Sequence, residues 1–168
     1  MTTKAIFFDM DGTIADLYGV DNWLPKLLAK DVTPYMDAQP LGDMRALDHK
    51  LSILATLGYT IGVVSWCAKN APDDAKANRA YDAQVRKAKR AWLEEHLPSV
   101  TKIHVVKHGT DKSRAIRLTA NKMEKCILFD DELNNCQAWQ RHTNYEAVHV
   151  TRFDDIIHWV DTELKKVG

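Results

Sequence analysis

Short apolar runs alternate with amphipathic segments along most of the chain. An apolar run bounded by polar residues predicts a strand buried on both faces, whereas apolar residues spaced three and four apart predict a helix. The alternation of these two patterns predicts an α/β fold, in which helices cover both faces of a parallel sheet. The runs that predict strands are 4–8, 60–65, 103–106, 126–129 and 147–150.

The segments between these runs carry the helix signals. One leucine stripe ends before Gly58, a residue type that commonly ends helices because it tolerates positive φ. That stripe consists of Leu47, Leu51, Leu54 and Leu57. After a polar stretch over 67–78, a second stripe stops before Pro98 and consists of Val85, Ala88, Trp92 and Leu93. Further helices are predicted from near Asp111 through Leu118, over 136–142, and over 153–164. We interpret these stripes, including Trp92 and Trp159, as core packing.

The composition is that of an ordinary globular domain. Hydrophobic residues make up 45% and charged residues 27% of the 168 residues, so one domain over 1–168 can bury a core. Lys plus Arg equals Asp plus Glu at 23 each, and this balance does not favour nucleic-acid or membrane partners. No apolar run approaches the length of a membrane span, and no leader pattern precedes the first strand. We therefore expect a cytoplasmic protein.

The cysteines and histidines do not predict a zinc site. Cys67, Cys126 and Cys136 lack the paired spacing of zinc ligands, and no two histidines stand at helical ligand spacing beside a glutamate. We expect the three thiols to be reduced and structural, and a zinc hydrolase is disfavoured.

Polar residues follow several predicted strands at their carboxyl ends. Asp9 and Asp11 follow the first strand, Ser65 ends the second, and Asp130 and Asp131 follow the fourth. Because parallel strands bring these ends to one edge of the sheet, we expect the side chains to lie together. Carboxylates from two strands suit a hard cation such as Mg²⁺, and a hydroxyl opposite them suits the oxygens of a phosphoryl group.

The loop after the third strand offers two candidates for an accompanying ammonium. We favour Lys112, because a cation in the first turn of a helix opposes the helix dipole and usually costs a few tenths of a kcal/mol. Lys107, at the end of the third strand, remains the alternative.

Each motif also has an ordinary structural interpretation. An Asp-Gly pair is common in turns, two acidic residues before a helix commonly cap it, and a serine at a strand end is most often a turn residue. The occurrence of Asp9 and Asp11 together with Asp130 and Asp131 on neighbouring elements favours the functional interpretation.

Four segments occur in an order that matches one family. They are the D-x-D-G-T run from Asp9 to Thr13, the strand that ends in Ser65, Lys112, and the strand that ends in Asp130-Asp131. In these segments the chain resembles the haloacid dehalogenase-like phosphohydrolases, over about residues 4–150. The short segments 89–92, 109–113 and 128–131 resemble the small 5'(3')-deoxyribonucleotidases of that family. The resemblance implies a Rossmann-like, doubly wound sheet with a small cap after the first strand, at about 16–45.

The resemblance also implies a phosphate chemistry for the polar residues. Asp9 would attack phosphorus to form an aspartyl-phosphate, and Asp11 would protonate the leaving alcohol and then activate water. Ser65 and Lys112 would stabilise charge on the transferring group.

The same resemblance implies a magnesium site. Mg²⁺ would be held by Asp9, by the backbone carbonyl of Asp11 and by Asp130, whereas Asp131 would orient the metal ligands or a metal-bound water.

Substrate choice would depend on the cap and on the loop after the second strand. Aromatic side chains there can stack on a nucleobase, or they can simply close the cap over the core. Polar side chains in the loop can contact a phosphate or sugar, or can be a solvated surface. The aromatic and apolar candidates are Tyr18, Trp23, Tyr35, Met36 and Trp66, and the polar candidates are Lys69, Asn70, Lys76 and Arg79.

The sequence therefore predicts a Mg²⁺-dependent phosphomonoester hydrolase for a small molecule, with a nucleoside monophosphate as the first choice. One alternative is a phosphatase for sugars, proteins or polynucleotide ends. The other is a binding module that keeps the fold without turnover.

Overall fold

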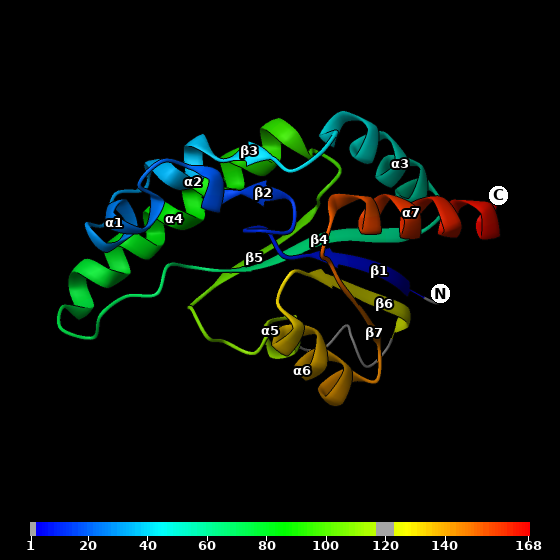
Figure 1. Cartoon of the computed structure of the whole chain (residues 1–168). Coiled ribbons are helices and arrows are strands. Elements are labelled where there is room, and N and C mark those ends of the chain that lie inside the picture. Colours follow the sequence, from blue (N-terminus) through cyan, green and yellow to red (C-terminus); the bar gives the residue numbers. More distant parts are fainter. Residues whose placement is uncertain (1–2, 117–122) are drawn as a thin grey trace.

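The computed structural model describes residues 3–116 and 123–168 (Figure 1). A parallel five-stranded sheet, in the order β5-β4-β1-β6-β7, forms the middle layer. Its strands are β1 (Thr3–Phe8), β4 (Tyr59–Trp66), β5 (Lys102–Val106), β6 (Met123–Asp130) and β7 (Glu146–His149). The predicted α/β architecture with a Rossmann-like parallel sheet is thereby confirmed.

The strand order reverses at the centre of the sheet. The chain proceeds outward from β1 to β4 and β5, and then returns to the other side of β1 with β6 and β7. Ligands of such sheets bind beyond the carboxyl ends of the strands at this reversal. The residues that follow β1 and β6 therefore occupy the most informative position in the fold.

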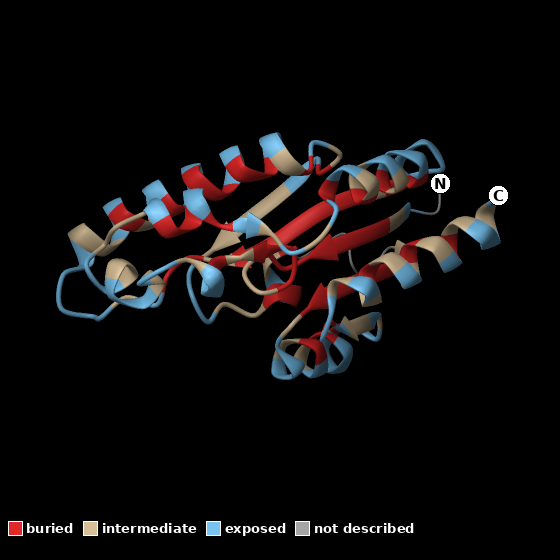
Figure 2. Ribbon diagram, turned by 45° about the horizontal axis from the view of Figure 1, so that its top comes forward, coloured by how far each residue is buried: buried red, intermediate tan, exposed pale blue. Residues whose placement is uncertain are grey.

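Helices cover both faces of the sheet, because successive side chains of a strand point to opposite faces. Ile6 and Phe8 pack in one cluster with α3 (Met44–Thr56) and α7 (Phe153–Val167). Ala5 and Phe7 pack in the other cluster, on the side of α5 (Lys112–Ala115) and α6 (Leu133–Thr143). Figure 2 shows the three central strands, β4, β1 and β6, as the most continuously buried part of the sheet, whereas the edge strands β5 and β7 are partly exposed.

A small layer of short elements lies beyond the carboxyl ends of the strands. It consists of the antiparallel pair β2 (Ala15–Asp16) and β3 (Gln39–Pro40), the 3₁₀ helix η1 (Leu17–Gly19), α1 (Trp23–Leu28) and α2 (Thr33–Asp37). These elements pack against the first half of α4 (Ala75–His96), where Leu17, Tyr35 and Tyr81 are buried together (Figure 1). They occupy the insertion predicted at about 16–45, and α3 begins inside that range, at Met44.

The start of α4 differs from the prediction, and the predicted end of α5 is not tested. Helix α4 begins at Ala75, inside the stretch 67–78 that was predicted as polar loop, because the Asp74 carboxylate accepts a hydrogen bond from Ala77 N and caps the helix. Helix α5 spans Lys112–Ala115, and the predicted extension to Leu118 lies outside the described residues. The predicted end of α3 is confirmed, since Gly58 has a φ of 92°.

The three cysteines are buried and unpaired, as predicted. Within 3–116 and 123–168, none of the helices combines the length and the apolar character that crossing a membrane requires.

Candidate functional site

The acidic ends of β1 and β6 meet at the reversal of strand order. Asp9 N donates to Phe129 O at 2.8 Å, which holds the residue after β1 beside β6. Lys112, at the start of α5, reaches between the two carboxylates. Its Nζ lies 2.8 Å from Asp9 Oδ1 and 2.6 Å from Asp130 Oδ2. Asp130 is fully buried and Lys112 is 5% exposed. Buried charges are tolerated when they are paired in this way.

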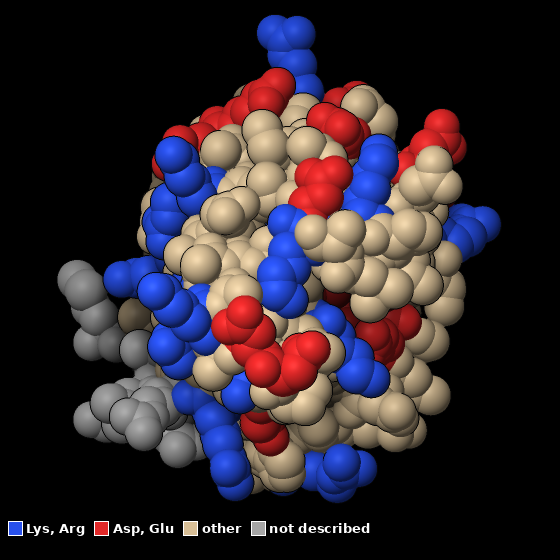
Figure 3. Space-filling model, turned by 90° about the vertical axis from the view of Figure 1, so that its left-hand side faces the viewer, with Lys and Arg blue, Asp and Glu red and all other residues tan. Residues whose placement is uncertain are grey.

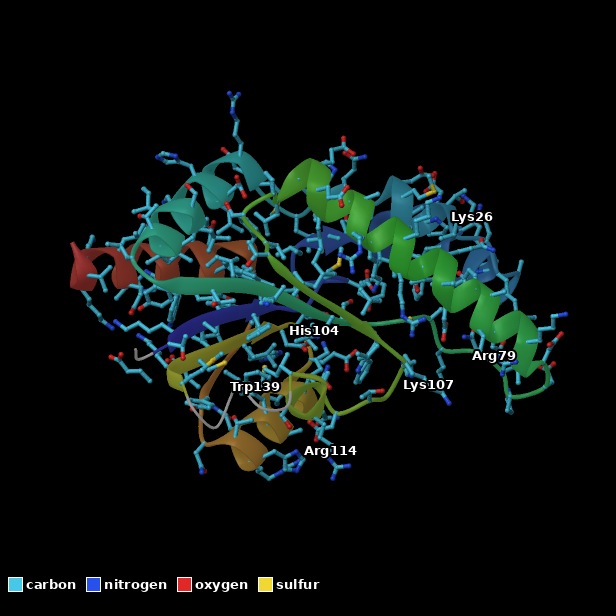
Figure 4. All side chains as sticks on the ribbon, turned by 180° about the vertical axis from the view of Figure 1, so that it is seen from behind. Lys26, Arg79, His104, Lys107, Arg114 and Trp139 are labelled. Carbon is cyan, nitrogen blue, oxygen red and sulfur yellow. The ribbon has the colours of Figure 1, made fainter. Side chains whose placement is uncertain are left out.

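Lys112, and not Lys107, contacts the acidic residues. Burial alone lowers the pKa of Lys112, but the charges of Asp9 and Asp130 outweigh burial and raise that pKa, so the ammonium stays charged. Lys107 is exposed in the loop after β5 (Figure 4). The geometry thus favours the first of the two candidate lysines.

The turn after β1 brings Asp131 into the same cluster. Thr13 Oγ1 lies 3.1 Å from Asp131 Oδ1 and 3.3 Å from Asp9 Oδ2, and it accepts a hydrogen bond from Asp131 N at 3.1 Å. Gly12 has a φ of 81°, and a Cβ at this position would lie 2.4 Å from Asp131 Oδ2. Glycine therefore leaves the room that the Asp131 carboxylate occupies.

Asp9, Asp130 and Asp131 can hold a metal ion together, since one carboxylate oxygen of each lies within 4.8 Å of the others. The sequence assigned Asp131 only to the surroundings of the metal. In the structure its carboxylate lies in the same cluster as those of Asp9 and Asp130, the two predicted side-chain ligands, because Thr13 fixes the turn after β6 against β1. Oxygen ligands of this kind fit a hard divalent cation and do not specify which one.

The pKa values of the carboxyls reflect their crowding. Burial and the Asp9 charge raise the pKa of Asp130 to about 6, although Lys112 opposes the rise. Burial, Asp9 and Asp130 raise the pKa of Asp131 to about 7. A bound cation would lower both values, because it favours the ionised form of each ligand.

Asp11 and Ser65 lie near a second buried ammonium. Lys89 Nζ donates to Asp11 Oδ2 at 2.7 Å, to Ser65 Oγ at 2.8 Å and to Trp66 O at 2.8 Å. The sequence did not single out Lys89 as a site residue. A signal was present, since Lys89 falls four residues after Val85 and three before Trp92, on the apolar stripe of α4.

A cavity of about 260 Å³ opens over part of the site, whereas the fully buried Ser65 does not line it. Asp9, Asp11 and Lys112 line its floor, and the short elements after β1 supply much of its apolar wall. That wall is formed by Leu17, Tyr18, Trp23, Leu24, Leu27, Leu28 and Tyr35. Five predicted substrate contacts line this cavity: Tyr18, Trp23, Tyr35, Trp66 and Lys69. The Trp66 ring lies 5.2 Å from Lys112 Nζ, and its Nε1 donates to Thr110 O.

Asn70 lies outside this cavity, in an adjoining groove. Its Nδ2 donates to Asp82 Oδ1 at 2.9 Å, so part of its hydrogen-bonding capacity is used within the chain. The groove has a volume of about 660 Å³ and shares Ala68, Lys69 and His108 with the cavity. Arg79 and Lys107 also line the groove (Figure 4). Figure 3 looks onto this end of the molecule, where basic and acidic side chains both gather.

The chain matches no protein-family model, and a comparison with curated proteins found no match.

Proposed function

We propose that the protein is a Mg²⁺-dependent phosphomonoester hydrolase that works through an aspartyl-phosphate. The observation that carries the proposal is the contact of Lys112 with both Asp9 and Asp130, beside Asp131, at the reversal of strand order. An ion pair that served the fold alone would not need two buried carboxylates on one ammonium, with a third carboxylate beside them, at the floor of a cavity. The resemblance to the haloacid dehalogenase-like phosphohydrolases supports the same assignment.

In the first step an Asp9 carboxylate oxygen forms a bond to phosphorus while the bond from phosphorus to the leaving oxygen breaks. Asp11 gives its proton to that oxygen, which leaves as an alcohol. Burial raises the pKa of Asp11, against the opposing effect of Lys89, and this favours the protonated acid that the step needs. The Lys112 ammonium would offset charge on the phosphoryl oxygens, and the resemblance implies a stabilising hydrogen bond from the Ser65 hydroxyl.

In the second step water attacks phosphorus and the bond from phosphorus to Asp9 breaks. Asp11, now ionised, takes the proton of the water, and inorganic phosphate leaves. Asp9, Asp130 and Asp131, with the backbone carbonyl of Asp11, would hold Mg²⁺, which when bound offsets the repulsion between Asp9 and phosphate and polarises the phosphoryl oxygens.

The cavity supports a nucleoside monophosphate as the substrate. Its wall is apolar and aromatic above the polar floor, as a nucleobase would require. Tyr18 and Trp23 meet edge to face at 5.0 Å, so they form a preformed aromatic surface at the cavity.

The adjoining groove favours a second substrate class, the phosphorylated end of a polynucleotide. Among the described residues that line it, the groove carries the cations of Lys69, Arg79 and Lys107 against the single carboxylate of Asp82, and Lys69 also lines the cavity. Further phosphates of a strand that entered the cavity by its end would meet these cations.

The test is phosphate release from a substrate panel, with Mg²⁺ or with EDTA. The panel contains nucleoside 5'- and 3'-monophosphates, sugar phosphates, a phosphopeptide, and oligonucleotides phosphorylated at either end. We expect phosphate release to depend on Mg²⁺ and to be lost in the Asp9→Asn variant. Asp154→Asn, which changes an exposed carboxyl on α7, is the control that should keep activity. Faster hydrolysis of oligonucleotide ends would select the second substrate class. Mg²⁺ binding without hydrolysis of any substrate would refute the enzyme and support a binding module.

A further inference from the structure

Lys89 is a buried cation that the reaction steps above do not use. Its side chain is 1% exposed, although it comes from the middle of a long helix whose other face is solvated. Burying an ammonium is costly unless every donor finds an acceptor. The residue is therefore held by specific contacts rather than by general burial.

Those contacts use the full donor capacity of the ammonium. A lysine has three N–H donors, and Lys89 has three acceptors at hydrogen-bond distance: Asp11 Oδ2, Ser65 Oγ and Trp66 O. The Tyr35 ring lies on another side of the ammonium, with its centroid 4.9 Å from Nζ. The three acceptors come from the turn after β1 and from the end of β4. Lys89 ties these two segments together.

The contacts also set what Asp11 can do. Asp11 lines the cavity and Lys89 does not, so Lys89 can act on a substrate only through its neighbours. The bond to Oδ2 fixes the orientation of the Asp11 carboxyl. Ser65 is fully buried and does not line the cavity, so its contact with Lys89 anchors the ammonium.

We propose that Lys89 is a positioning residue that aims the Asp11 carboxyl at the leaving-group oxygen. The inference rests on the proposed hydrolase function. Lys89 itself transfers no proton and touches no substrate atom.

The test is a double-mutant cycle of Lys89→Met and Asp11→Asn, measured as kcat/KM for the best substrate of the panel. General acid catalysis contributes roughly 10²–10⁴ in rate. In the wild-type background we expect Lys89→Met to lower kcat/KM by roughly 10- to 10²-fold, because a general acid that is not oriented toward the leaving oxygen transfers its proton inefficiently. In the Asp11→Asn background, where there is no acid to aim, the same change should cost less than about threefold. Lys87→Met, at an exposed position of the same helix, is the control that keeps activity.

A second measurement separates aiming from folding. With aryl phosphates as probes, kcat/KM reports the transfer to Asp9, and 4-nitrophenolate leaves with little need of a proton. We expect Lys89→Met to cost phenyl phosphate hydrolysis at least about tenfold more than 4-nitrophenyl phosphate hydrolysis. Circular dichroism and thermal unfolding of each variant report folding independently.

An equal loss in both Asp11 backgrounds, or an equal loss for both aryl phosphates, would overturn the inference while the hydrolase proposal stands. A wild-type protein that hydrolyses nothing would overturn the proposed function, and the inference with it.

Discussion

Replacing Lys112 by Met tests the centre of the site most directly. Methionine keeps most of the aliphatic stem, so the change removes the charge and its two hydrogen bonds. Lys112 Nζ lies 2.8 Å from Asp9 Oδ1 and 2.6 Å from Asp130 Oδ2. At an effective dielectric constant of about 20, each contact corresponds to about 6 kcal/mol of attraction, much of which desolvation offsets.

The expected loss of activity follows from what the charge does in the transition state. Removal of one preorganised donor costs roughly 10²–10³ in rate. Because Lys112 is charged and buried between two carboxylates, we expect Lys112→Met to lower kcat/KM by roughly two to four orders of magnitude. Lys107→Met is the matched control, since Lys107 is exposed in the same loop, and it should change kcat/KM by less than about tenfold.

The assay is steady-state phosphate release by both purified variants, with circular dichroism as the check on folding. We also expect Lys112→Met to be less stable than the wild type in EDTA, by about 2 to 3 kcal/mol, because the carboxylates of Asp9 and Asp130 lose their cation. Protonation of Asp130, whose pKa is already about 6, limits that loss. Greater damage from Lys107→Met would show that this reasoning is wrong.

Three further outcomes follow from the same geometry. Asp9→Asn should remove at least three orders of magnitude of kcat/KM without unfolding the protein, and a retained rate above about a tenth of the wild type would exclude the aspartyl-phosphate. Asp130→Ala and Asp131→Ala should both raise the Kd for Mg²⁺ at least about tenfold in calorimetric titrations, and the rise should be larger for Asp130→Ala. A wild-type Kd for Asp131→Ala would show that Asp131 is not a metal ligand. Mg²⁺ affinity should be full above pH 7 and should fall as pH drops through the pKa values of about 7 and about 6 of Asp131 and Asp130, because protons compete for the same oxygens; an affinity that stays constant between about pH 5.5 and 8 would contradict these shifts.

The sheet and the convergence of its acidic ends could be predicted because both depend on local patterns. A continuous apolar run predicts a strand that is buried on both faces. The structure agrees, since it fully buries Ile127, Leu128 and Phe129. Parallel strands then place the residues after β1 and β6 at one edge, whatever the details of packing. The pairing of Asp9 with Lys112 required only that a long side chain at the start of α5 turn toward that edge.

Other features depended on tertiary contacts that no local pattern contains. Asp131 joins the acidic cluster because Thr13, 118 residues away, contacts both its carboxylate and its amide. Asn70 is adjacent in sequence to Lys69, which lines the cavity, yet Asp82 of α4 holds its amide in the groove. The sequence can therefore predict that a loop is polar, but it cannot predict which of the loop's side chains line the cavity.

The position of Lys89 has its explanation in the two surfaces that α4 covers. Val85 and Ala88 pack with Tyr35 in the cluster beneath the short elements, whereas Trp92 and Leu93 pack in the cluster on the sheet. Lys89 lies between these two clusters, where α4 passes the carboxyl ends of β1 and β4. An apolar side chain at this point would leave Asp11 Oδ2, Ser65 Oγ and Trp66 O facing it without a donor, and an unpaired buried acceptor costs about 1 to 3 kcal/mol. The lysine therefore interrupts the apolar stripe where α4 faces polar atoms of the site. The same placement lets Lys89 hold the Asp11 carboxylate in one orientation.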